Sequence, residues 1–206
     1  MKQIILALLF FVINQYSFAQ EKTFEGVIKY RTINTSYIDQ GDTIESIVDT
    51  TYSSIYHKNG NYVVIELNSS EKQIFLRKSC KIYVLPADGS EVQVFPGVMQ
   101  ESVLEFDSLV DQKEILGYNC KGISLKTGSI VYTGYFSPVH FMNTLGLKNC
   151  NFWNLEFLND KIPFYSVLEE PGSYKLEMTA FDILSGPVDD DLFVLPKNAP
   201  NDFIKD

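Results

Sequence analysis

The chain has 206 residues, a formal net charge of −9 and a hydrophobic content of 45%. This hydrophobic content argues against a disordered protein, and an acidic chain repels phosphate backbones, which argues against nucleic acid as a partner. The length suits one domain, since domains run to about 100–200 residues.

The N-terminal residues are typical of an export signal. Lys2 precedes an apolar run at residues 4–13, and Ser17-Phe18-Ala19 gives the small-x-small end that a signal peptidase requires. A membrane-spanning helix needs about 20 apolar residues, and this run is shorter. We therefore interpret residues 1–19 as a signal peptide and predict one β-rich domain over residues 20–206, periplasmic or secreted, with no transmembrane segment in the mature chain.

The first half of the domain has the pattern of short strands. Residues 23–33 alternate between apolar and polar side chains at their start. Residues 51–57 and 62–67 flank Asn59-Gly60, a pair typical of a tight hairpin turn. We predict further strands over residues 73–77, 81–85 and 92–95, with a turn at 86–89.

The second half begins with a different pattern. Apolar spacings of three and four over residues 97–111 predict a short amphipathic helix. Two further hairpins are then predicted: residues 118–125 with 129–137, and residues 161–168 with 174–184. Residues 138–158 are apolar without a clear period. Residues 185–206 have the composition of a closing segment that packs on the domain through its apolar side chains.

Several predicted strands are apolar on both faces, for example residues 62–65 and 130–132. A sheet with one face in water would alternate. No long helical stretch separates the strands, which excludes a parallel α/β fold. We therefore predict a mainly β fold, a curved antiparallel sheet or half-barrel with one or two short helices.

Two short motifs resemble those of serine β-lactamases: Ser69 to Lys72 fits S-x-x-K, and Lys126-Thr127-Gly128 fits K-T-G. That chemistry needs the serine and the lysine at the start of a helix, whereas these residues lie between predicted strands. His57 adjoins a predicted turn, where we expect it to be solvated, and His140 lies in an apolar run, where we expect a core position. We predict that the chain is not an enzyme.

The cysteines and acidic residues do not match the spacing of a metal-binding motif. Cys80, Cys120 and Cys150 allow at most one intrachain disulfide, and the sequence leaves open whether any pair forms. Their spacing matches no zinc site. The run of aspartates at 189–191 lacks the alternation of a calcium loop and predicts a solvated acidic turn. We predict no metal and no cofactor.

Several segments together resemble GLPGLI-type and related secreted bacterial proteins. They are the signal end at residues 18–20, the start at 24–30, the Leu-Gly-Tyr-Asn-Cys-Lys strand at 116–121, the aromatic strand at 132–138, the late strand at 176–180 and the ending at 188–196. The resemblance implies a curved sheet like that of the LolA/LolB lipoprotein carriers, which hold acyl chains in an open half-barrel. It implies no known enzyme activity.

Two functions of different classes remain. In the first, the concave face binds a lipid, an acyl chain or an apolar peptide, and the residues expected to line the site are Phe24, Ile28, Tyr30, Tyr132 and Phe136. In the second, the chain is a structural or protein-interaction module of the cell envelope with a filled core. An open apolar groove would favour the first, and a packed interior with an exposed apolar patch would favour the second.

Overall fold

The computed structural model describes residues 23–39, 44–96, 105–140, 161–197 and 199–200. Its strands form one 11-stranded sheet in the order β6-β5-β4-β3-β2-β1-β11-β10-β9-β8-β7, and every pairing is antiparallel. The strands are β1 Gly26–Asp39, β2 Ile44–Lys58, β3 Asn61–Glu66, β4 Lys72–Leu76, β5 Lys81–Leu85, β6 Gln93–Pro96, β7 Glu105–Ile115, β8 Tyr118–Thr127, β9 Ile130–His140, β10 Lys161–Glu170 and β11 Tyr174–Ser185.

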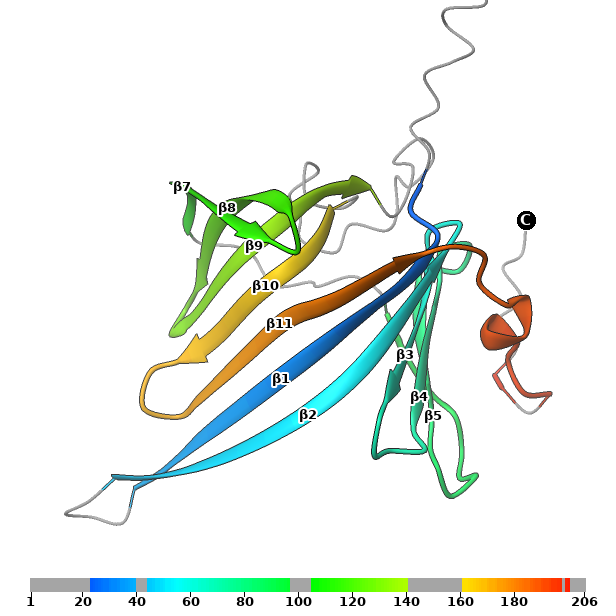
Figure 1. Cartoon of the computed structure of the whole chain (residues 1–206). Coiled ribbons are helices and arrows are strands. Elements are labelled where there is room, and N and C mark those ends of the chain that lie inside the picture. Colours follow the sequence, from blue (N-terminus) through cyan, green and yellow to red (C-terminus); the bar gives the residue numbers. More distant parts are fainter. Residues whose placement is uncertain (1–22, 40–43, 97–104, 141–160, 198, 201–206) are drawn as a thin grey trace, which may run out of the picture.

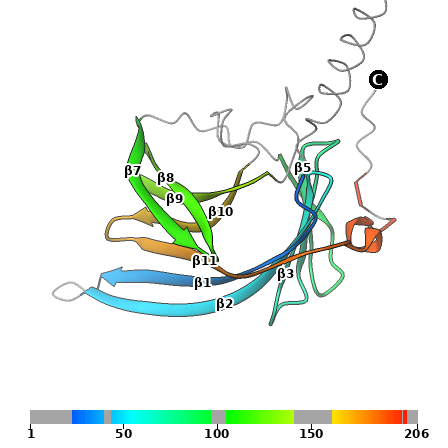
Figure 2. The ribbon, with the colours of Figure 1, turned by 45° about the horizontal axis from the view of Figure 1, so that its top comes forward.

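The sheet is strongly curved (Figures 1 and 2). Strands β1, β2 and β11 form its middle. The flank of β3 to β5 and the flank of β7 to β10 rise on either side of this middle, as Figure 2 shows. The predicted fold class, a curved antiparallel sheet of half-barrel shape, is confirmed.

The predicted hairpins are also confirmed. Asn59 and Gly60, between β2 and β3, both have positive φ angles, 53° and 77°. These angles are the signature of the tight turn that Asn-Gly favours. Gly128 joins β8 to β9 and Gly172 joins β10 to β11, again with positive φ.

The predicted helix over residues 97–111 is wrong where the structure describes it. Residues 97–104 lie outside the described parts of the chain, and β7 begins at Glu105. The pairing of β7 with β8 shifts register between Ser108 and Gln112. An irregularity of this kind interrupts the alternation of a strand, so apolar spacings of three and four arise without a helix. The described helical element is a single 3-10 turn, η2 (Asp190–Phe193).

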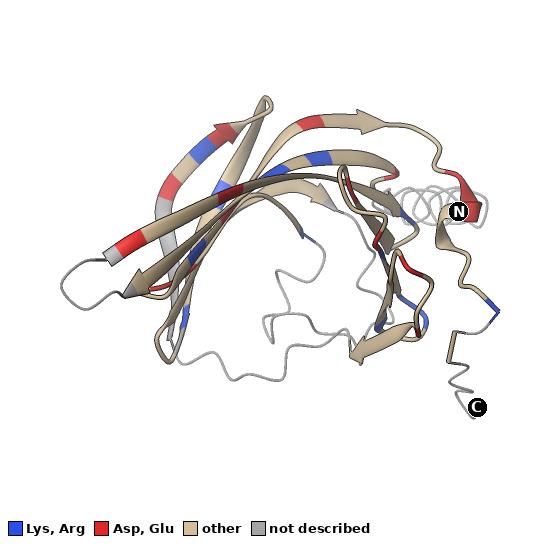
Figure 3. Cartoon of the chain, turned by 90° about the horizontal axis from the view of Figure 1, so that it is seen from below, with Lys and Arg blue, Asp and Glu red and all other residues tan. Residues whose placement is uncertain are grey.

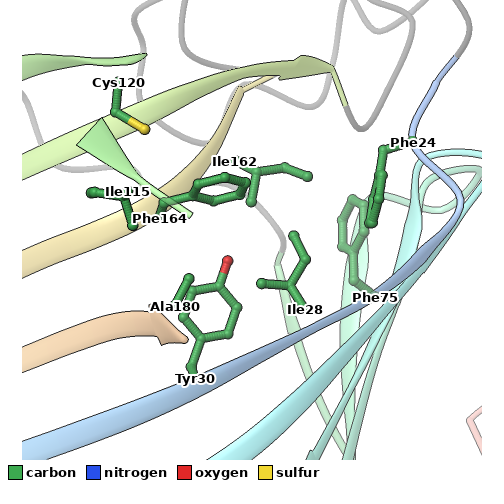
Figure 4. Close-up of a cluster of buried hydrophobic side chains, with 9 residues drawn as sticks. All are labelled: Phe24, Ile28, Tyr30, Phe75, Ile115, Cys120, Ile162, Phe164 and Ala180. Carbon is green, nitrogen blue, oxygen red and sulfur yellow. The ribbon is translucent and has the colours of Figure 1, made fainter. Parts of the chain in front are cut away.

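Buried side chains lie on both faces of the sheet. Figure 4 shows the concave side, where Ile28 and Tyr30 of β1 meet Ile162 and Phe164 of β10. On the convex side, apolar residues of β3 to β5 are covered by the segment that follows β11 and contains η2 (Figure 1). This packing explains why strands on this flank are apolar on both faces, and it agrees with the predicted closing segment.

Two predicted regions fall partly or wholly outside the described residues. These are the signal peptide, residues 1–19, and the apolar region at 138–158, of which residues 138–140 belong to β9.

Candidate functional site

A row of apolar side chains crosses four strands on the concave face. Leu125 of β8 pairs with Tyr132 of β9, Tyr132 pairs with Leu168 of β10, and Leu168 pairs with Leu176 of β11. Residues directly opposite each other on neighbouring strands project from the same face. We call these four residues the outer row.

The outer row faces the inside of the curve. Met178 lies two residues from Leu176 on β11, hence on the same face, and it packs against the buried cluster drawn in Figure 4. Burial changes along this face. Ile28 and Tyr30 are 0% and 1% exposed, whereas Tyr132, Leu168 and Leu176 are half-buried. Leu125, at the β8 end of the row, is buried at 5% exposed. The concave side therefore has a closed inner part and a more open stretch of the outer row at Tyr132, Leu168 and Leu176.

The five residues predicted to line a ligand site fall into two groups. Phe24, Ile28 and Tyr30 belong to the closed inner cluster, in contact with protein side chains from several strands. Phe136 is 5% exposed and forms a second cluster with Ile123 and Leu125, against which Tyr132 packs. Only Tyr132 belongs to the outer row, and a ligand-binding role for the five stays a prediction.

Hydroxyl groups on the concave face are neutral. The Tyr30 hydroxyl donates a hydrogen bond of 3.0 Å to the Pro163 carbonyl oxygen. Burial, with a smaller effect of Tyr132, raises the pKa of Tyr30. Burial also raises the pKa of Tyr132, although a hydrogen bond with the Ser166 side chain acts in the opposite direction. Both phenols therefore stay protonated at neutral pH.

Polar side chains flank the outer row towards the hairpin turns. Leu176 pairs with Asn34 on β1. Glu170 ends β10, pairs with Tyr174 and accepts a hydrogen bond of 2.8 Å from the Ser129 hydroxyl. Figure 3 shows acidic and basic positions distributed along the strands. An apolar row beside a polar edge suits an amphipathic ligand whose polar end stays in water.

His57 corrects a prediction. We expected a solvated residue beside a turn, but His57 is 5% exposed. Its ring lies near the rings of Phe24 and Tyr62, with centroid distances of 5.8 and 6.3 Å. The register explains this position, because His57 pairs with Gly26 and Tyr62 and so shares their concave face. Burial lowers its pKa to about 3. The His140 side chain lies outside the described residues.

The two β-lactamase-like motifs lie on opposite flanks of the sheet. Ser69 lies between β3 and β4, where its hydroxyl accepts a hydrogen bond of 3.0 Å from the Glu71 N–H. Lys126 and Thr127 end β8 on the other flank (Figure 1). Neither motif has the helical setting that the chemistry requires.

The structure answers part of the question about the cysteines. Cys80 is disulfide-bonded, Cys120 is a buried free thiol, and Cys150 lies outside the described residues. In the described ranges, no group of three or more His, Cys, Asp or Glu side chains could hold a metal ion. The predicted acidic turn is exposed, and Asp189 caps η2 through the Asp191 N–H at 3.0 Å.

No helix in the described parts is long and apolar enough to cross a membrane.

No protein-family model matches the sequence, and no curated protein matches it. Among solved structures, the chain is similar to PNGF-II in space group C2, with a TM-score of 0.45, 14% identity and coverage of 81% of this chain but 29% of that chain. It is also similar to a LolA superfamily protein from Nitrosomonas europaea, with a TM-score of 0.42, 9% identity and coverage of 84% of this chain and 91% of that chain.

A DUF1329 family protein from Desulfovibrio piger gives a TM-score of 0.34 at 9% identity, covering 85% of this chain and 92% of that chain. All three TM-scores are below 0.5, so these likenesses assign neither an activity nor a ligand. The resemblance to GLPGLI-type proteins stays a prediction.

From the sequence we predicted strands at Leu168 and Leu176, but we did not assign either residue to a ligand site. Their alternation gives a common face within each strand. It does not give the register between strands, and a shift of one residue would reverse the face.

Proposed function

We propose that this chain is a binding protein of the cell envelope that holds an apolar ligand, such as an acyl chain, on the outer row of its concave face. The observation that supports the proposal is the half-buried apolar row Tyr132, Leu168 and Leu176, which continues from a closed core towards a polar edge. The envelope location is supported by the predicted signal peptide at residues 1–19.

The energetics allow such binding. Burial of apolar surface contributes roughly 25 cal/mol per Å², so an acyl chain that covers a few hundred Å² gains several kcal/mol. Loss of translational and rotational freedom offsets part of this gain. The net result is compatible with a dissociation constant of about micromolar order.

A titration with a fluorescent fatty acid tests the proposal. The wild type should bind saturably, and Leu176→Gln should weaken binding about tenfold, because it replaces apolar contact surface of the row with a polar amide that the ligand would have to desolvate. Leu184→Gln is the matched control, since Leu184 lies on the same strand but is 52% exposed. Leu184 pairs with Val27 and so projects from the convex face. Thermal unfolding of both variants separates lost binding from lost folding.

Phe136→Ala adds a measurement of stability. Phe136 packs with Ile123 and Leu125 and is 5% exposed. Its truncation should cost about 3–5 kcal/mol if these residues form a structural core. Absence of saturable fatty-acid binding by the wild type, or an equal loss in the Leu176 and Leu184 variants, would overturn the proposal.

A protein-interaction module with a filled core is the second candidate. It is favoured by exposed aromatic residues on the convex face, where Tyr52 and Phe181 are 41% and 48% exposed and their rings lie 6.0 Å apart. A photo-crosslinking residue at Phe181 should then trap one defined partner in the native host. The same residue at Leu116, which is 37% exposed on the β7–β8 turn, serves as the control.

A further inference from the structure

Strand β2 lies between β1 and β3 and is longer than its pairing with β3. β3 pairs with Ser53 to Lys58 of β2, and the last contact along this line is a hydrogen bond of 2.8 Å from the Leu67 N–H to the Tyr52 carbonyl oxygen. β1 pairs with β2 as far as Ile44. Figure 1 shows the β1–β2 hairpin extending past β3. Within the described ranges, residues 46–50 therefore pair on one side only, and we call them the open edge of β2.

The backbone of the open edge presents hydrogen-bonding groups outward. Because the Tyr52 carbonyl points to the β3 side, the alternation of a strand directs the groups of Thr50, Val48 and Ser46 the same way. The Asp49 carboxylate accepts a hydrogen bond of 2.8 Å from the Thr50 N–H. The outward groups of Val48 and Ser46 are in position to pair with an added strand.

Two side chains of this edge are apolar although more than half of their surface is exposed. Ile47 and Val48 are 57% and 61% exposed and project from opposite faces. Edge strands are normally protected by charged residues, proline or bulges. Here, the charged residue is Asp49, which pairs with Asn34 on β1.

We propose that the open edge of β2 receives an extended segment of a partner protein as an added antiparallel strand. That segment carries a basic residue opposite Asp49, followed by two apolar residues opposite Val48 and Ile47. Backbone hydrogen bonds provide the affinity of such an addition, and alternate side chains provide its selectivity.

A second copy of this chain fits the edge poorly. The outward N–H and C=O groups belong to even-numbered residues. In an antiparallel pairing of two copies, each even-numbered residue must therefore face another even-numbered residue, so the two-fold axis passes through one residue of the strand. Centring on Ile47 places Asp49 opposite Glu45, and centring on Val48 places Ile47 opposite Asp49. Centring on Asp49 places that carboxylate opposite its own copy. The registers centred on Ile47 and on Asp49 place like charges directly opposite each other, which is destabilising, and the register centred on Val48 leaves Asp49 opposite an apolar side chain. A basic partner segment instead meets Asp49 with the opposite charge.

The site is independent of the proposed ligand row. The outer row lies on β8 to β11, whereas the open edge lies on β2, on the other side of β1 in the strand order. Failure of fatty-acid binding therefore leaves this proposal in place, and failure of strand addition leaves the ligand proposal in place.

Fluorescence anisotropy with a labelled peptide, Thr-Lys-Val-Ile-Thr-Lys-Thr, tests the proposal on the full chain. The wild type should bind this peptide saturably. It should bind the version with both lysines replaced by glutamate about tenfold more weakly or worse. N-methylation of the valine amide should abolish binding, because that amide donates to the Val48 carbonyl in the proposed register.

Two variants locate the site. Asp49→Lys should abolish the preference for the lysine peptide over the glutamate peptide, because the charge at position 49 then favours the glutamate peptide, whereas Glu45, opposite the second variable position, still favours the lysine peptide. Val48→Pro removes an outward N–H that β1 does not use, so the fold should persist while binding is lost; thermal unfolding checks this. The proposal is overturned if the lysine peptide does not bind saturably, if Val48→Pro binds it as the wild type does, or if light scattering shows a wild-type dimer that Val48→Pro dissociates.

Discussion

The hydroxyl of Tyr30 on β1 donates a hydrogen bond of 3.0 Å to the carbonyl oxygen of Pro163 on β10, although β11 lies between these two strands. In a flat sheet, two strand spacings amount to about 10 Å, and a side chain perpendicular to the sheet would not reach that backbone. The hydrogen bond therefore depends on the curvature of the sheet, and it closes the inner part of the concave face.

Tyr30→Phe should destabilise the domain by about 1–3 kcal/mol, because it leaves a partly buried carbonyl oxygen without this donor. Urea unfolding followed by circular dichroism measures the change. Tyr52→Phe is the control, since Tyr52 is 41% exposed and should tolerate the loss of its hydroxyl. Equal stability of the wild type and the Tyr30 variant would show that the bond contributes nothing to the fold.

Burial of His57 should make stability depend on pH. The pKa of His57 falls from 6.5 to about 3 in the folded chain, so the unfolded state binds the proton more tightly. The stabilising contribution is complete above pH 6.5 and is lost progressively as the pH falls towards 3. Between pH 7 and pH 5 the loss should be about 2 kcal/mol.

The comparison variant for this titration is His57→Phe, which keeps an aromatic ring beside Phe24 and Tyr62 but cannot titrate. Burial raises the pKa of Tyr62 to about 12, so Tyr62 does not titrate in this range. For each protein, we compare the free energy of unfolding at pH 7 with that at pH 5. A substitution that changes stability equally at both pH values does not affect this difference. Parallel pH profiles for the two proteins would contradict the burial of His57.

Cys120 should behave as a protected thiol. It is 0% exposed, its Sγ donates to the Tyr118 carbonyl oxygen at 3.5 Å, and burial raises its pKa. The thiolate is the reactive form. We expect no alkylation at pH 8 in the native state and complete alkylation in denaturant, with peptide mapping to identify the site. Rapid labelling of Cys120 in the native protein would place β8 differently.

The turns were the part of the fold that the sequence predicted best. Asn59-Gly60 and Pro171-Gly172 have few alternative conformations, so local residues alone locate these hairpins. The curved sheet followed from strands that are apolar on both faces. For β3 to β5, the second apolar face is explained by Leu192 and Phe193, which pack on the convex side.

Features that depend on pairing between distant strands could not be predicted in the same way. His57 was expected in water because its neighbours form a turn, and only its register with Gly26 and Tyr62 shows that it lies inside. β7 lost its alternation at a register shift after Ser108. The outer row required the pairing of Leu168 with Leu176, which no local pattern contains.

A charged cluster attaches the C-terminal segment to the start of the sheet. The Lys58 Nζ donates to the Val188 carbonyl oxygen at 2.7 Å and lies 2.9 Å from Asp190 Oδ1 and 3.7 Å from Glu25 Oε1. The Glu25 carboxylate also accepts a hydrogen bond of 3.0 Å from the Val188 N–H. Glu25 thus holds the segment directly, whereas Asp190 acts through Lys58, and its side chain is 86% exposed.

Glu25→Ala should loosen the C-terminal segment, because it removes both the acceptor for the Val188 N–H and one carboxylate near Lys58. Asp190→Ala should change little, since an ion pair with a largely exposed partner is screened by water. Hydrogen–deuterium exchange of residues 186–197 measures the difference, with faster exchange expected in Glu25→Ala alone. The apolar side chains beneath the segment, Val63, Ile74 and Tyr83, are at most 4% exposed when it is in place, so Glu25→Ala should also increase the binding of a hydrophobic dye. If Asp190→Ala accelerated exchange as much as Glu25→Ala, the exposed ion pair and not the Glu25 hydrogen bond would hold the segment.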